Sequence, residues 1–179
     1  VGGSASASFS IQNIGSGGPA LRGAIQTTGI TSAALHGSGV AAQNWGALAQ
    51  GASTGPYTVT FAPTAAGALQ GQALQVVNNF DNVAGQTLAL TGAAYRLADA
   101  APLQPVQLAA QRVGGTLMQA VTLTNTAAAD GFSERLNASI QGSGAVLASG
   151  SVGLLAAGQS STALQVGVDY GQAGGRFVG

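Results

Sequence analysis

The sequence predicts an all-β protein composed of two tandem β-sandwich modules, the second truncated at its C-terminal end. Three observations predict this class: short segments that alternate apolar and polar residues, turn-forming residues between them, and a series of motifs that occurs twice in one order. No convincing helical period of 3.6 residues is present. Strands of five or six residues at short spacing are typical of a sandwich or a barrel.

Alternation of side chains defines the predicted strands. In segment 7–12 the alternation places Phe9 and Ile11 on one face, and Pro63 ends a similar strand at 57–61. The remaining predicted strands lie at 73–77, 86–91, 106–109 and 120–124.

An alanine-rich stretch at 33–49 competes for a helix, but Gly37, Gly39 and Gly46 would each cost about 1 kcal/mol in a helix interior. We therefore expect strand and loop there. The stretch also contains a loose Gly-x-Gly-x-x-Ala pattern. Dinucleotide binding would require a following helix and an acidic residue about 20 positions further on, whereas the nearest downstream carboxylate is Asp81. A turn that recurs at 142–144 explains the glycines better, and we expect no cofactor.

The internal repeat is the strongest long-range signal. Two motifs recur at an offset of 112 residues, namely 1–4 at 113–116 and 9–13 at 121–125. Further on, the offset shortens, as loop insertions would cause: 48–51 matches 155–158, and 59–61 matches 166–168. Because the order is kept throughout, the matches predict a true repeat.

The modules are predicted to be 1–98 and 99–179, and each lacks strands that the other has. Module 1 continues past Gly71 with two strands that have no counterpart in module 2 before Gly179. Conversely, residues 103–112 are a predicted first strand of module 2, and module 1 has no such segment before Val1.

The residues of both modules resemble a known family, the immunoglobulin-like repeat domains of the choice-of-anchor D type found in bacterial secreted and surface proteins. The resemblance is carried by 57–63, Gly67, 74–79 and 88–92 in module 1, and by 121–126, 130–133 and 154–158 in module 2. It implies immunoglobulin-like sandwiches, export to the cell surface or the extracellular space, tandem arrays, and adhesive or scaffolding roles.

Charge restricts the partners. Only 6% of residues are charged, against about 25% in typical soluble domains, there is no lysine, and the net charge is zero. Five scattered arginines do not supply the cationic face that nucleic-acid binding requires. No run of about 18 apolar residues occurs, so no membrane-spanning segment is predicted. Near-zero net charge favours association.

The chemistry-bearing residues do not form a recognisable catalytic or metal motif, and we predict a non-enzymatic protein. His36 is the only histidine, and no nucleophile elbow surrounds it. The carboxylates are isolated in sequence; Asp130 and Glu134 form the best local cluster, which leaves a bound calcium ion open. Trp45 and Tyr57 could belong to a carbohydrate-binding platform, but we favour core packing for these aromatic side chains.

An incomplete sandwich exposes a sheet edge and an apolar groove, and a strand from another chain can cover both. Segment 103–111 suits this role, with Leu103 at its start and with Val106, Leu108 and Ala110 predicted on one face. We therefore predict a structural, self-associating module of an extracellular filament or a tandem-repeat surface protein. Its partners are copies of itself or, equally, neighbouring repeats of the same chain. An adhesin stalk or a carbohydrate-binding surface module is the alternative.

Overall fold

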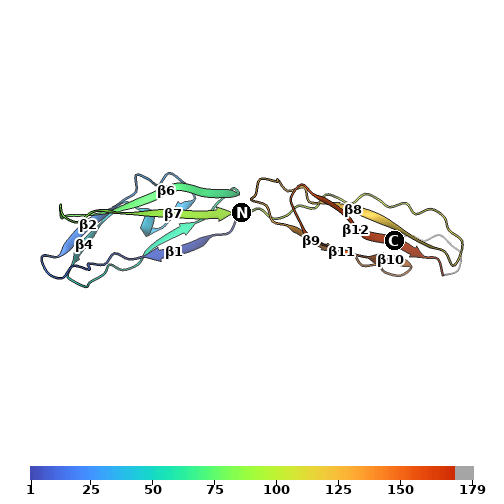
Figure 1. Cartoon of the computed structure of the whole chain (residues 1–179), viewed down its shortest axis with the longest axis horizontal. Helices are drawn as coiled ribbons and strands as arrows, with labels where there is room; N and C mark the ends of the chain where they lie inside the picture. Colours follow the sequence, from blue (N-terminus) through green and yellow to red (C-terminus); the bar gives the residue numbers. More distant parts are fainter. Residues whose placement is uncertain (172–179) are drawn as a thin grey trace. The chain divides into compact units, whose positions relative to one another are not determined.

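The computed structural model describes residues 1–171 and is almost entirely β-structure, which confirms the predicted all-β class (Figure 1). Its backbone contacts divide the chain into two compact units, Val1–Ala94 (unit 1) and Tyr95–Gly179 (unit 2). The sequence placed the boundary a few residues later, between 98 and 99.

Unit 1 consists of two antiparallel sheets (Figure 1). One has the strand order β1-β5-β3 and the other the order β4-β2-β6-β7. The strands are β1 (Ala5–Phe9), β2 (Leu21–Gln26), β3 (Leu35–His36), β4 (Gln43–Leu48), β5 (Tyr57–Phe61), β6 (Gly67–Asn78) and β7 (Gln86–Ala94), with a short 3-10 helix, η1 (Ser38–Val40), after β3.

The core of unit 1 lies between the two sheets. Its centre is formed by Ile25, Trp45 and Leu74, which are 1%, 5% and 0% exposed. Gly23 on β2 lies opposite Trp45 on β4, and a Cβ atom at residue 23 would overlap both the indole ring and the carbonyl oxygen of Val77. The glycine therefore makes room for the only tryptophan of the chain.

Unit 2 has the same arrangement over its described residues. One sheet has the order β10-β12-β8, and the second pairs β11 with β9. The strands are β8 (Thr116–Thr124), β9 (Leu136–Ser139), β10 (Val146–Ser149), β11 (Ser151–Leu155) and β12 (Ser160–Asp169). The buried centre consists of Val121, Leu123, Val152 and Leu164.

The strand registers match the sequence repeat residue by residue. Ala7 on β1 lies opposite Val59 on β5, and Gln119 on β8 lies opposite Val166 on β12. Residues 7 and 119 differ by the 112-residue offset, and the pair 59 and 166 is one that the motif alignment had matched. The second sheets agree as well, because Gly23 faces Trp45 where Ala138 faces Val152. In unit 2 a smaller residue, Val152, takes the place of Trp45, and an alanine takes the place of Gly23.

Two local predictions need correction. Segment 106–109 is extended but forms no β-strand; Pro102 and Pro105 lack the N–H groups that a regular ladder would use beside it. The glycine turns at 37–39 and 142–144 are not equivalent, because the first follows β3 whereas the second precedes β10.

Candidate strand-binding groove

Strand β1 places small side chains toward the core. Residues directly opposite each other in an antiparallel pair share a face, so Ala5 and Ala7, opposite Phe61 and Val59, point inward. Ser6 and Ser8 point outward, and the Ser6 hydroxyl lies 2.8 Å from that of Thr60. Ala5 and Ala7 are nevertheless exposed. The inward face of β1 is therefore open to solvent.

Strand β7 contributes the facing wall. Leu88 lies opposite the fully buried Leu74, and Gly92 lies opposite Leu69, so Leu88, Leu90 and Gly92 point toward the core. Leu88 is still 37% exposed, although its face is the inward one.

Between these two strands lies an apolar cavity of about 470 Å³, which we call the edge groove. Its walls are residues 5–9 of β1 and 88–93 of β7, and its floor is formed by Leu35, Val59, Phe61 and Leu69. No strand within residues 1–171 pairs with the free edge of β1 or of β7. Neither strand carries a charged residue or a proline, the devices that usually protect such edges from pairing with another chain.

In unit 2, a chain segment lies beside the corresponding edge, which is the outer edge of β8. Ala100 forms an antiparallel bridge with Asn125, just beyond the end of β8, and the chain then leads back to the turn before β8. Val106 packs against the core cluster of unit 2. Segment 100–112 therefore lies where the first strand of module 2 was predicted.

This segment is held by few backbone hydrogen bonds. In the described range, Pro102–Leu108 makes no backbone hydrogen bond. Besides the packing of Val106, a hydrogen bond that the Tyr170 hydroxyl donates to the carbonyl oxygen of Ala109, at 3.1 Å, lies next to that stretch. Of the four predicted assembly residues, Val106 and Leu108 are half-buried, Ala110 is exposed, and Leu103 is 49% exposed. Whether these residues join copies of the chain stays a prediction.

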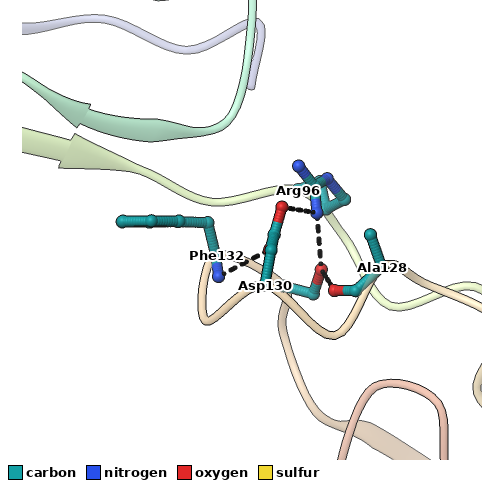
Figure 2. Close-up of polar contacts among 5 residues, drawn as sticks. Arg96, Ala128, Asp130 and Phe132 are labelled. Atoms are coloured by element: carbon teal, nitrogen blue, oxygen red, sulfur yellow. Dashed lines mark hydrogen bonds and ion pairs between the residues drawn. The ribbon is translucent and has the colours of Figure 1, made fainter.

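The start of the segment is fixed by the ion pair between Arg96 and Asp130, in which Nη1 lies 2.7 Å from Oδ2 (Figure 2). Arg96 Nη1 also donates to the Ser133 hydroxyl, and the Phe132 N–H donates to Asp130 Oδ1 at 2.9 Å. The Phe132 N–H and the Arg96 guanidinium hold the pKa of Asp130 below its ordinary value. Sequence reasoning missed this role, because it considered Asp130 only as a cation ligand.

The two aromatic candidates for a sugar platform pack into unit 1. Trp45 is 5% exposed and belongs to the core, and Tyr57 is half-buried, with its ring centroid 5.4 Å from that of Phe9. A buried indole presents no face to a sugar, so these residues do not form a joint surface platform.

Within residues 1–171, no three His, Cys, Asp or Glu side chains lie close enough together to hold a metal ion. Among the described residues, no helix is long and apolar enough to cross a membrane.

Comparison with known proteins identified no relative: no protein-family model matches the chain, and no curated protein matches it. The resemblance to choice-of-anchor D domains therefore stays a prediction, and the edge groove is the feature from which a function can be argued.

Proposed function

We propose that this chain is a non-enzymatic structural module that associates with copies of itself, the edge groove of one copy accepting an extended strand from another. The observation that carries the proposal is the groove itself, an apolar cavity flanked by two unpaired and uncharged strand edges. A strand added from another chain would pair its backbone groups with an open edge, while its alternate side chains would fill the cavity.

The energetics favour such an occupant over a small ligand. The groove walls offer backbone N–H and C=O groups along β1 and β7, and each hydrogen bond to an added strand contributes about 0.5–1.5 kcal/mol. Each valine or leucine side chain that becomes buried contributes about 1.5–3 kcal/mol more. The net charge of zero removes the electrostatic repulsion that normally keeps copies apart.

The setting we propose is an extracellular filament or a tandem-repeat surface protein of the bacterial kind. A strand-into-groove contact joins two different surfaces, so it is heterologous and builds an open polymer when its rotation does not close a ring. The resemblance to surface-protein repeats is in keeping with this setting.

Filling the groove from within tests the proposal. In Ala7→Leu the added side chain projects into the cavity, and we expect sedimentation velocity and negative-stain microscopy to detect loss of the polymers formed by the unmodified chain. Ser8→Leu is the matched control, since it adds the same side chain to the outer face of the same strand. Polymers that persist in Ala7→Leu, or an unmodified chain that stays monomeric at every concentration, would show the proposal to be wrong.

A further inference from the structure

The chain beside β8 displays how a strand can pair with this type of edge. Ala100 and Asn125 form the antiparallel bridge. Two backbone hydrogen bonds flank it in the same register, from Ala101 N–H to the Thr124 oxygen (2.9 Å) and from Thr126 N–H to the Asp99 oxygen (2.7 Å).

Continuing this register one residue for one residue gives the positions of the apolar side chains. Val106 then lies opposite Gln119, and Leu108 lies opposite Leu117. Gln119 is on the inward face of β8, since it lies opposite Val166, which packs against the core. The half-buried state of Val106 and Leu108 and the exposure of Gln107 agree with the face that this register assigns to each.

The repeat transfers the register to unit 1. Gln119 corresponds to Ala7, and Leu117 corresponds to Ala5, because each pair occupies the same position relative to β12 and β5. A strand in the edge groove with this register would place Val106 opposite Ala7 and Leu108 opposite Ala5. Two branched apolar side chains would thus fill the space that two exposed alanines leave.

Asn13 offers a second anchor for the same register. Its counterpart, Asn125, uses Oδ1 to accept both the Ala127 N–H and the Asp99 N–H, each at 3.2 Å. Asn13 Oδ1 accepts the Gly15 N–H at 3.0 Å, and no second donor to it lies within residues 1–171. A carboxamide oxygen has two acceptor positions, so the Asp99 N–H of an incoming strand would meet an unused one.

We infer that the occupant of the edge groove is segment 99–111 of a second copy, antiparallel to β1, with Val106 opposite Ala7, Leu108 opposite Ala5 and the Asp99 N–H on Asn13 Oδ1. The inference rests on the proposed function and adds the donor segment and its register. No backbone hydrogen bond of Pro102–Leu108 within the described residues has to break for the transfer, and the contact of Val106 with the core of unit 2 would be exchanged for an equivalent one at Ala7.

Engineered cysteines test the register, because the chain has none of its own. A copy carrying Ala7→Cys is mixed with a copy carrying Val106→Cys, and a second mixture combines Ala5→Cys with Leu108→Cys. The bonds that flank Ala100 and Asn125 make them a non-hydrogen-bonded pair, and in the same register 7–106 and 5–108 are pairs of this type. Their Cα atoms then lie about 4.5 Å apart, within the range of disulfides, so mild oxidation should link both pairs. The mismatched control combines Ala7→Cys with Leu108→Cys. Mass spectrometry of linked peptides identifies the bond, while tryptophan fluorescence and circular dichroism verify that each variant folds.

We expect 7–106 and 5–108 linkages between copies, and loss of linkage in the mismatched mixture. Dominant 7–108 linkage would overturn the register. Polymers that Ala7→Leu abolishes, but in which neither matched pair becomes linked, would overturn this inference and leave the proposed function standing.

Discussion

The outer edges of β1 and β8 are equivalent positions with different surroundings. Both strands pair on their other side with equivalent strands in the same register. Beside β8, the chain itself supplies a neighbour that begins at the Ala100–Asn125 bridge, whereas β1 borders the edge groove. The difference therefore does not arise from the strands. What differs is the presence of segment 100–112 beside β8, and by the inference above segment 99–111 of a second copy completes β1.

The hydrogen bonds of the matched asparagines Asn13 and Asn125 also differ between the two edges. Asn13 Nδ2 donates to the Leu48 oxygen at 2.9 Å, and Asn125 Nδ2 donates to the Leu155 oxygen at 3.1 Å. The bonds to Asp99 and to the Glu134 oxygen are found only at Asn125, which is 0% exposed. Asn125, beside the covered edge of β8, is thus more deeply buried and forms more hydrogen bonds than Asn13 beside β1.

The largest expected effect comes from removing these side chains. Asn125→Ala leaves buried carbonyl and N–H groups unsatisfied, so we expect unit 2 to lose about 3 kcal/mol of unfolding free energy. Asn13→Ala, at a half-buried site with fewer bonds, should cost unit 1 about 1–2 kcal/mol. Urea unfolding measures both: Trp45 fluorescence reports on unit 1 alone, and circular dichroism reports on both units.

Equal losses of unfolding free energy in Asn13→Ala and Asn125→Ala would contradict the comparison. They would mean that the segment beside β8 adds nothing to the stabilisation that Asn125 provides. Adding a chain segment beside β1 should, by the same reasoning, raise the cost of Asn13→Ala in the polymer above its cost in the monomer.

A second prediction compares Gly23 with its counterpart in unit 2, Ala138. Gly23→Ala forces a methyl group into the Trp45 ring and the Val77 oxygen, and such overpacking costs about 1–3 kcal/mol. Ala138→Gly, at the equivalent position opposite Val152, should cost unit 2 only about 0.5–1 kcal/mol. The urea midpoint followed by Trp45 fluorescence checks the first value. The double variant Gly23→Ala with Trp45→Val, followed by circular dichroism, should not recover the lost stability, because the overlap with the Val77 carbonyl oxygen remains.

Much of the sandwich could be predicted from the sequence, because its strands alternate cleanly. Strand β5 was predicted with the bounds that the structure has, Tyr57–Phe61. Strand β2 (Leu21–Gln26) was missed: Gly23, required beside Trp45, and the half-buried Ala24 interrupt the alternation of a strand that lies between two others. Packing against its neighbours β4 and β6 determines which residue types occupy β2 more than a regular alternation does.

The edge groove could not be predicted from the sequence. Its two walls, β1 and β7, are separated by most of unit 1 in the sequence, and only the packing of the sheets brings Ala7 and Leu90 to one cavity. The Arg96–Asp130 pair also joins residues distant in sequence, and the spacing of isolated charges contains no signal for it.

The smallest predicted effect concerns this ion pair, which fixes the start of the segment beside β8. The pKa of Asp130 is lowered in the folded protein, first by the Phe132 N–H and then by Arg96. Its contribution to stability is therefore complete above the unfolded pKa, near the ordinary value of 3.8, and is lost as the pH falls through the folded pKa. Because the carboxylate is exposed, we expect only a slight fall of the unit 2 urea midpoint on acidification below pH 4.

Asp130→Asn should remove that part of the acid dependence, and it should speed hydrogen exchange of the Phe132 amide at neutral pH, because a neutral amide accepts this bond less strongly than a carboxylate does. Asp81→Asn, in the turn between β6 and β7, is the matched control and should leave the exchange unchanged. An unaltered Phe132 exchange rate in Asp130→Asn would mean that other contacts hold the start of the segment, with the parallel bridge between Arg96 and Ser133 as the next to test.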